Sequence, residues 1–558
     1  MVVMPGRTTL FGLVQIVLLI PQFIIATDEA PPPDLGQQPI YDDGLNPNSY
    51  MRDSRDDLVV KTSLFTVQGA VSPETPKVRQ FLGIPYAESP VGKLRFRPPV
   101  SRSATNEVVD ATRHGPSCHQ HSPASATRSL FSEHLPGFVP AESSTQSEDC
   151  LTLDIWAPRQ SRQSDEESKN IGASAVMIWI HGGALMTGGS STPYERGTRL
   201  VDGHEDIIVV SINYRLNIFG FPRAEALDGH NLNPAFLDIR KGVEWVYQNI
   251  HNFGGNPNQM VLFGDSAGSS SVDKYTYAWA HDPLVRGFIM MSGQGEISGD
   301  PTDHSNFTYV ADRVGCEGDD KDELFTCMQE VAAEKIMDVL NQYDPKANGG
   351  RMLNFQPQAD NETSFSNYTD LQVRGLYAPL PQIIGNCDNE FTSLFQPFTG
   401  SAPDQELIDM LSNGMFICPA AKAARARQER GTPIWRYRYF GEFPNLNPLP
   451  WLRTYHSSDI PMVFGTSDTY APDTPEGSAV SKYLQSVWVA FAKDPEHALT
   501  EQFNWPPYVE TEETLVRLGW ENSAEPDFVR GDTYDKPCNP MAGAQGQDSP
   551  DTLLKYIV

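Results

Sequence analysis

The chain has 558 residues, enough for several average domains or for one large α/β core with insertions, so its length does not fix the domain count. Apolar residues make up 39% of the chain and aromatic residues 10%, which is ample material for a buried core. The formal net charge of -29 repels phosphate backbones and anionic membrane surfaces, and no run of Lys or Arg offsets it. The charge therefore argues against nucleic acid as a partner.

The first 26 residues have the pattern of a secretory signal peptide. Arg7 precedes a largely apolar stretch at residues 10–25, and the small residue Ala26 comes before a polar, Pro-rich segment. A single membrane anchor is the alternative, but the apolar stretch is shorter than the roughly 20 residues that span a bilayer. We expect a secreted protein with a signal peptide at residues 1–26, a linker at 27–57 and one domain at 58–558, and no stable membrane span.

Three Asn-x-Ser/Thr sequons agree with secretion and predict glycosylation at Asn306, Asn361 and Asn367. Such triplets also arise by chance. They agree with a secretory signal peptide but are weak evidence by themselves.

Beyond the linker, short β-branched runs alternate with longer helical patterns, which is typical of a mostly parallel sheet covered by helices. Apolar residues recur at helical spacing in residues 237–250 and 478–492, and both segments are predicted helices. The clearest predicted strands are residues 175–180, 207–212, 260–263, 382–384 and 434–439. The pattern indicates the α/β class, with a large, mostly parallel central sheet flanked by helices.

The strongest motif is Gly264-Asp265-Ser266-Ala267-Gly268, the only G-x-S-x-G in the chain, which directly follows an apolar strand. A serine in this motif lies at the apex of a tight strand-to-helix turn, where the flanking glycines avoid clashes and the hydroxyl projects from the sheet. A Gly-rich turn with an idle serine is the alternative. We predict that Ser266 is a nucleophile. For Asp265 three roles stay open: it tunes the site, binds a buried water or serves only the turn.

A second predicted strand, at residues 176–180, runs into the sequence His181-Gly182-Gly183-Ala184 upstream of the serine. Backbone amides in such a loop approach a substrate closely, as an oxyanion hole requires. A simple turn is the alternative reading. We assign the amides of Gly183, Ala184 and Ala267 to the oxyanion hole, and we interpret His181 as a support for the loop.

Six stretches occur in order along the chain: FLGIPYAESPVGKLRF (81–96), SEDCLTLDIW (147–156), HGGALMTGG (181–189), NYRLNIFGF (213–221), NFGGNPNQMVLFGDSAG (252–268) and YHSSDIPMVFGT (455–466). Together they resemble the type-B carboxylesterase and cholinesterase family. The runs NPAFLDIRKGVEWV and SVDKYTYAWAHDP look most like its secreted fungal carboxylesterases. The resemblance implies the α/β-hydrolase fold and a triad in the order serine, acid, histidine.

The resemblance also assigns the acid and the base. The family's acid follows a strand in a segment that ends Asp-Glu-Gly, and residues 384–391 here read IGNCDNEF. Glu390 therefore takes the place of the acid, with Asp388 as the rival. Phe391 stands where the family has Gly, a departure that affects the geometry of the loop. The base is carried over onto His456.

Two further departures affect the substrate. Ala184 stands where the family commonly has a third Gly; at a positive φ angle it costs roughly 1 to 2 kcal/mol relative to Gly, and we expect narrower acceptance of bulky groups. The loop that carries Phe131 and Phe138 has no Trp, the residue on which cholinesterases hold a quaternary ammonium. Acetylcholine is therefore not the expected substrate. Residues 130–140 are apolar enough for a lid, with a plain gorge wall as the alternative.

Seven cysteines in a secreted chain predict three disulfides and one odd thiol. The resemblance implies two pairs, Cys118 with Cys150 and Cys316 with Cys327. Only two of the remaining three can pair; we favour Cys418 with Cys538, which leaves Cys387 free. Arg95 and Glu148 match a structural salt bridge of the family.

The sequence therefore predicts a secreted serine carboxylic ester hydrolase that acts through an acyl-enzyme on Ser266, with a small-molecule or lipid-like ester as substrate. No cofactor or metal is expected, since the acyl-enzyme chemistry requires none and no Cys/His cluster has zinc spacing. Two alternatives stay open: an acyltransferase or cyclase of secondary metabolism on the same triad, and a binding protein that kept the fold without the chemistry. The sequence does not indicate an oligomeric state.

Overall fold

The computed structural model describes residues 56–121, 130–140, 145–159, 173–227, 229–295, 299–348, 352–395 and 400–538. The predicted signal peptide and all of the predicted linker except Asp56 and Asp57 lie outside these ranges. The described residues all belong to one compact unit.

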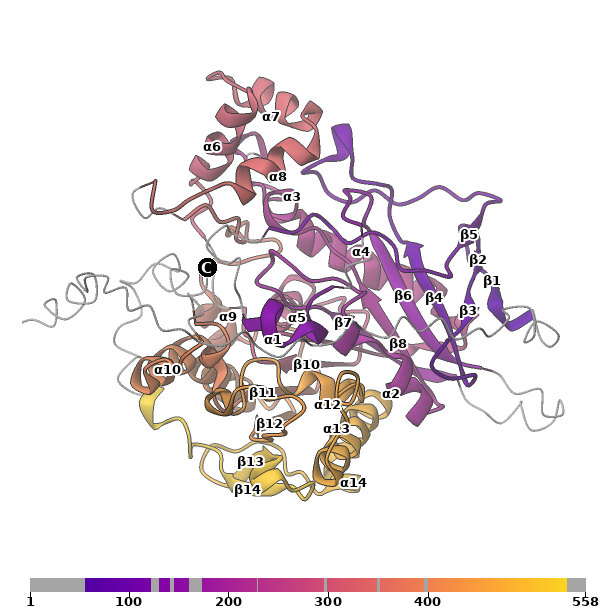
Figure 1. Ribbon diagram of the computed structural model, residues 1–558, viewed down its shortest axis with the longest axis vertical. Coiled ribbons are helices and arrows are strands. Elements are labelled where there is room, and N and C mark those ends of the chain that lie inside the picture. The colour runs from indigo at the N-terminus through magenta and orange to yellow at the C-terminus, as the bar shows by residue number, and fades with distance from the viewer. Residues whose placement is uncertain are drawn as a thin grey trace, which may run out of the picture. The chain divides into compact units, whose positions relative to one another are not determined.

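A large sheet contains 11 strands within the described ranges (Figure 1). They are β3 (Ala70–Val71), β4 (Val78–Pro85), β6 (Thr152–Pro158), β7 (Ser174–Ile180), β8 (Ile207–Ile212), β9 (Gly255–Asp265), β10 (Gly287–Met291), β11 (Gln382–Cys387), β12 (Ile434–Tyr439), β13 (Glu513–Leu518) and β14 (Asp527–Arg530). Their order across the sheet is β14-β13-β12-β11-β10-β9-β7-β8-β6-β4-β3. A separate small sheet is made of β1 (Val59–Lys61), β2 (Thr66–Gln68) and β5 (Val108–Asp110).

From β13 to β8 every neighbouring pair of strands is parallel, whereas the pairs toward both edges of the sheet are antiparallel. This confirms the predicted mostly parallel sheet. The five strands predicted from sequence correspond to β7, β8, β9, β11 and β12.

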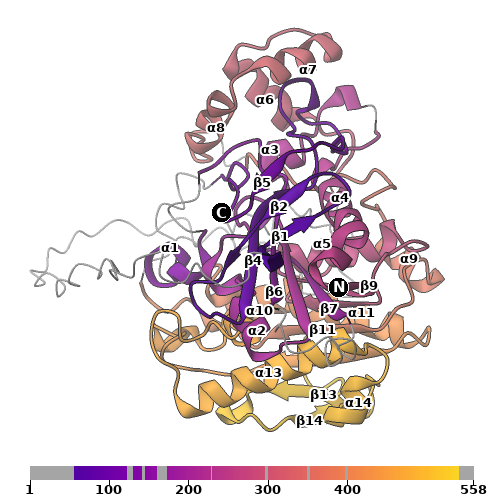
Figure 2. The same cartoon turned by 90° about the vertical axis from the view of Figure 1, so that its right-hand side faces the viewer.

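The described helices are α1 (Leu130–His134), α2 (Thr198–Gly203), α3 (Asn217–Gly220), α4 (Pro234–Asn249), α5 (Ala267–Ala278), α6 (Ser305–Val314), α7 (Lys321–Glu330), α8 (Ala333–Asn341), α9 (Tyr368–Arg374), α10 (Gln405–Ser412), α11 (Cys418–Gln428), α12 (Ile460–Phe464), α13 (Pro475–Lys493) and α14 (Ala498–Phe503). The two predicted helices correspond to α4 and α13. Helices α6, α7 and α8 gather at one end of the molecule, away from the sheet (Figures 1 and 2).

Strand β7 shows why a strand at the centre of the sheet has a continuous run of apolar residues in its sequence. All its residues are buried, because successive side chains point to opposite faces and both faces are covered. Ile178 belongs to a core shared with α4 and α5, whereas Met177 and Trp179 belong to a second core shared with α12, α13 and α14. The two sets of helices lie on opposite sides of the sheet (Figure 2).

The parallel strands bring the predicted site together. The Gly-rich loop follows β7, Ser266 follows β9, Glu390 follows β11, and His456 lies in the connection after β12. The carboxyl ends of parallel strands meet at one edge of a sheet, where ligands bind in open α/β folds. Four segments far apart in sequence therefore meet at one edge.

Three disulfides join Cys118 to Cys150, Cys316 to Cys327 and Cys418 to Cys538. Cys387 is free and buried. The third disulfide connects the first residue of α11 to a residue 120 positions later, beyond β14. It closes by far the longest of the three loops and so restricts the unfolded chain most strongly.

We expect replacement of Cys418 and Cys538 by serine to lower the free energy of unfolding more than replacement of Cys316 and Cys327. On loop-closure entropy the losses are about 5 and about 3 kcal/mol, because the separations are 120 and 11 residues. Urea unfolding of the two double variants under non-reducing conditions measures the difference. Equal losses, or the opposite order, would contradict the entropic account.

Candidate active site

Ser266 occupies the sharp turn between β9 and α5. Its φ of 56° and ψ of -123° lie outside the ordinary regions for a residue with a side chain, and its amide donates to Met291 O at 2.9 Å. A Cβ on Gly268 would overlap Ile180 O, and one on Gly264 would lie 2.7 Å from the Gly268 carbonyl carbon. Only glycine fits at these two positions. Strained backbone of this kind is found at active sites, where the surrounding structure maintains it.

The Gly-rich loop packs against this turn. A Cβ on Gly182 would lie 3.2 Å from Ser266 Cβ, so the loop and the serine are direct neighbours. Gly183 has a φ of 102° and Ala184 a φ of 55°. Within the described ranges, the amides of Gly183, Ala184 and Ala267 donate no hydrogen bond. Three amides are thus available for an oxyanion.

His181 supports the start of this loop. Its ring stacks on Tyr214 at 4.4 Å, and the Tyr214 hydroxyl donates to His181 O at 2.7 Å. Nδ1 of His181 lies 2.8 Å from Gly182 O. Burial lowers the pKa of His181 to about 4, so the ring is neutral near neutral pH and its Nδ1–H donates to Gly182 O.

Glu390 and His456 form a buried pair. Glu390 Oε2 lies 2.5 Å from His456 Nδ1, and Glu390 Oε1 accepts from the amide of Cys387 at 2.7 Å. Asp388, the rival acid, is paired instead with Arg438 at 2.8 Å and Arg453 at 2.6 Å. The structure therefore places Glu390, and not Asp388, against the histidine.

The surroundings of His456 determine its pKa and the contacts of its second ring nitrogen, Nε2. Burial lowers the pKa of His456, but the charge and hydrogen bond of Glu390 outweigh it, and the pKa is raised overall. Nε2 is buried and has no hydrogen-bond partner in the described part of the chain, Ser266 Oγ included. The ring of Phe416 lies 4.7 Å from the imidazole, in a π-helix at Asn413–Ile417 between α10 and α11.

Phe391, which replaces the family's glycine, is accommodated without strain. It is absent from the residues with positive φ, and its fully buried side chain packs with Ile408, Leu411 and Phe416. Its amide donates to Ser412 Oγ at 3.0 Å. The acid loop is therefore anchored to α10 by a side chain that glycine lacks.

Further buried polar groups surround the triad, and sequence reasoning missed most of them. Ser457 Oγ donates to Asp265 Oδ2 at 2.6 Å, and the Tyr437 hydroxyl donates to Asp459 Oδ2 at 2.8 Å. Cys387 Sγ lies 3.6 Å from Asp459 Oδ1. A hydroxyl directly after the assigned base was the one available signal, since Ser457 lies within the quoted run YHSSDIPMVFGT.

The predicted lid or gorge wall contains α1 and a 3-10 turn at Pro136–Phe138. Leu130 and Leu135 pack on Leu452 and on Tyr455, the residue before His456. This segment thus contacts the loop that carries His456. Both the lid and the wall remain predictions.

The three predicted glycosylation sites differ in exposure. Asn306 is buried, and its Nδ2 donates to Asn354 O at 2.6 Å, so a glycan there would have to displace this bond. Asn361 and Asn367 are exposed. Asn367 Oδ1 also accepts from the amide of Asp370 at the start of α9.

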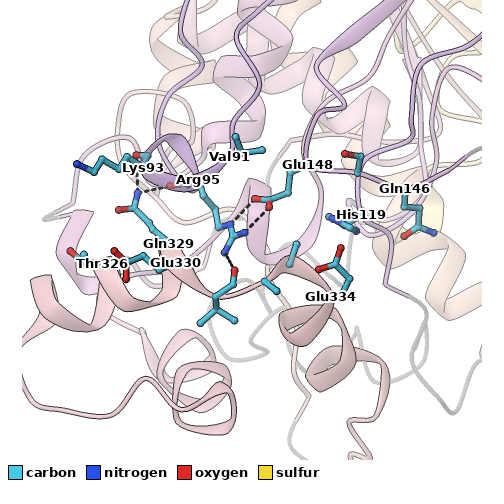
Figure 3. Close-up of a pocket in the computed structure, with 15 residues that line it drawn as sticks. Val91, Lys93, Arg95, His119, Gln146, Glu148, Thr326, Gln329, Glu330 and Glu334 are labelled. Carbon is cyan, nitrogen blue, oxygen red and sulfur yellow. Dashed lines mark hydrogen bonds and ion pairs between the residues drawn. The ribbon is translucent and has the colours of Figure 1, made fainter.

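A pocket of about 560 Å³ lies between the segment around Arg95 and helices α7 and α8 (Figure 3). Arg95 donates two hydrogen bonds of 2.6 Å to Glu148 and further ones to the carbonyls of Met328 and Val331. No member of the candidate triad lines this pocket. The contacts of Arg95 agree with a structural role for this pair.

The described ranges offer neither a metal site nor a membrane-spanning helix. No group of three or more His, Cys, Asp or Glu side chains is placed to hold a metal ion. No described helix combines the length and apolar character needed to cross a bilayer.

The mostly parallel sheet and the serine turn after its central strand define an α/β-hydrolase. A sequence model of the carboxylesterase family matches residues 56–401 and 396–535, and the chain belongs to that family. It is accordingly a carboxylic ester hydrolase.

Three relatives illustrate the relationship. Secreted lipase 5 of Gibberella zeae is 37% identical over 481 residues, which cover 82% of this chain and 89% of the relative. Chlorogenic acid esterase of Aspergillus niger is 38% identical over 441 residues, covering 78% and 83%. Para-nitrobenzyl esterase of Bacillus subtilis is 31% identical over 476 residues, covering 79% and 91%.

The positive φ of Ala184 generates a prediction. We expect Ala184→Gly to raise the free energy of unfolding by up to about 1 kcal/mol, because glycine relieves the strain and loses part of that gain to its greater freedom in the unfolded chain. It should also improve kcat/KM for branched acyl esters relative to acetates. Thermal unfolding and an ester series measure both effects. Ala184→Ser keeps the Cβ and should change neither the free energy of unfolding nor the preference for branched esters. An increase of either in this control would show that the Cβ is not the cause.

Proposed function

We propose that this protein is a secreted serine esterase that acts through an acyl-enzyme on Ser266, with His456 as base and Glu390 as acid. The observation that carries the proposal is the buried 2.5 Å contact between Glu390 and His456 Nδ1, while Nε2 has no hydrogen-bond partner among the residues that the structure describes. In a Ser-His-acid triad this nitrogen takes the serine proton. The strained backbone of Ser266 supports the same assignment, as do three amides that donate no hydrogen bond within the described part of the chain.

In the first half of the proposed cycle, Ser266 Oγ attacks the carbonyl carbon of the ester while His456 Nε2 accepts the hydroxyl proton. Glu390 stabilises the imidazolium that forms and fixes its orientation. The amides of Gly183, Ala184 and Ala267 bind the tetrahedral oxyanion; loss of one such donor typically raises a barrier by roughly 3 to 4 kcal/mol.

In the second half, His456 returns the proton to the leaving alcohol and the acyl group stays on Ser266. Water then attacks the acyl-enzyme with His456 again as base, and the carboxylic acid leaves. Every proton passes through His456 Nε2, and the cycle uses no metal or organic cofactor.

We propose small-molecule or lipid-like esters as substrates, in agreement with the names of the lipase and the chlorogenic acid esterase among the relatives. The predicted signal peptide and three disulfides support secretion, since disulfides persist in oxidising compartments. We further propose one catalytic domain, glycosylated at the exposed Asn361 and Asn367.

The test is hydrolysis of p-nitrophenyl esters from acetate to palmitate by the secreted protein and by Ser266→Ala. We expect wild type to turn over these esters, and an organophosphate to label Ser266 in peptide mapping. Addition of alcohols or amines measures transfer to another acceptor, which distinguishes an acyltransferase. A folded wild type that neither turns over esters nor is labelled would overturn the proposal and favour a binding role.

The two candidate acids give a matched pair of variants. We expect Glu390→Gln to lower kcat by up to about 10⁴-fold, because the imidazolium loses its stabilising carboxylate. Asp388→Asn changes a carboxylate two residues away that pairs with Arg438 and Arg453, and should lower kcat far less. Steady-state kinetics of both variants decide between them; an equal or larger loss in Asp388→Asn would reverse the assignment.

A further inference from the structure

Ser457, directly after the base, has a backbone conformation that favours glycine. Its φ is 71°, in the left-handed region, and its side chain is buried. A non-glycine residue there costs free energy relative to glycine, so a contact of its side chain is a candidate for what offsets that cost. The hydroxyl of Ser457 is the group that needs an explanation.

That hydroxyl makes one contact across the site. It donates to Asp265 Oδ2 at 2.6 Å, between residues 192 positions apart. Asp265 precedes the nucleophile and is buried, as is Ser457. One hydrogen bond therefore connects the loop of the base to the turn of the nucleophile, each through the residue adjacent to the reacting group.

The bond lies in a buried set of interacting groups. The titratable groups that interact with Asp265 and His456 are Glu390, Asp459, Glu195, Cys387 and Tyr437. Burial raises the pKa of Asp265, and Oδ1 of this carboxyl has no hydrogen-bond partner among the described residues. When it is ionised, Asp265 raises the pKa of His456.

We propose that Asp265 and Ser457 form a positioning pair, in which their hydrogen bond sets the distance and angle between His456 Nε2 and Ser266 Oγ. The inference rests on the function proposed above and adds two residues to the machinery. Glu390 orients the imidazole from its Nδ1 side. The Ser457–Asp265 bond fixes the backbone of the base loop relative to the nucleophile turn. The first contact therefore constrains the orientation of the ring, and the second constrains the position of the loop that carries it.

This arrangement predicts an effect on kcat with little effect on KM. Neither side chain is placed among the substrate-binding groups, whereas proton transfer depends steeply on geometry. A displacement of about 1 Å costs roughly 10²-fold in rate. Loss of the bond should therefore slow the chemical step and leave binding of the ester nearly unchanged.

The central variant is Ser457→Gly, because glycine adopts a φ of 71° without strain and its lack of a side chain removes the hydroxyl that donates to Asp265. Ser458→Ala is the matched control: it removes a buried hydroxyl from the same loop, whose contact is with Cys387 Sγ at 3.6 Å and not with the nucleophile turn. We expect Ser457→Gly to lower kcat at least about tenfold with KM changed less than about twofold. Ser458→Ala should retain the wild-type kcat.

Asp265→Asn tests the partner and adds a readout that a purely structural role would not change. The base works in its neutral form, so kcat/KM rises with pH as His456 loses its proton. Because burial raises the pKa of Asp265 to about 8, its charge acts on His456 only near and above that pH, so the wild-type profile should change near pH 8 and the profile of Asp265→Asn, which cannot ionise, should not. The profile of Ser458→Ala should coincide with that of the wild type.

The double variant Ser457→Gly with Asp265→Asn completes a cycle. A shared bond predicts that the double variant loses no more kcat than the more impaired single variant, whereas independent residues give multiplied losses. Two results would overturn the positioning pair: losses that multiply in the double variant, or a Ser457→Gly enzyme with the wild-type kcat. In either case the proposed function stands if wild type turns over esters and Ser266→Ala does not. An inactive wild type would overturn the proposed function itself.

Discussion

The site depends on the burial of a carboxylate next to an imidazole. An isolated charge in the interior is expensive, and Glu390 is fully buried. Its two oxygens are used on opposite sides, one by the amide of Cys387 and one by His456 Nδ1, so neither is left unsatisfied. Because that geometry exists only when the loops after β11 and β12 are both folded, the hydrogen bond and the surrounding fold require each other.

The sheet makes such a pair possible because loops, and not strands, carry the residues of the candidate site. The central strands are covered on both faces, whereas the residues that follow them have unusual backbones, with positive φ at Gly183, Ala184, Ser266 and Ser457. A regular core thus carries the stability, and the strained turns lie where several parallel strands end.

Much of this architecture could be predicted from the sequence. Strands that are buried on both faces appear in the sequence as short apolar runs, and the turn at Ser266 requires glycines because a Cβ would clash with nearby backbone. Both signals depend on neighbouring residues in the sequence, so they can be recognised without the fold. The favoured pairing of Cys418 with Cys538 could be only a preference, because nothing local brings residues 120 positions apart together. Phe391 could be recognised as a departure, but its packing against α10 depends on a tertiary neighbour. The contact between Ser457 and Asp265 could not be predicted for the same reason: the sequence shows two ordinary polar residues, and only the fold places Ser457 Oγ 2.6 Å from Asp265 Oδ2.

The guanidinium of Arg95 has a wider consequence for the outer part of the molecule. It reaches Glu148, two residues before one disulfide ends at Cys150, and the carbonyls of Met328 and Val331, just after another ends at Cys327. Four donors on one planar cation are needed for this, and an ammonium group offers only three and cannot match a carboxylate in two places. Two covalently closed loops are therefore joined by a non-covalent crosslink that contains no bond for a reductant to cleave, and lysine, although it carries the same charge, could not make the same contacts.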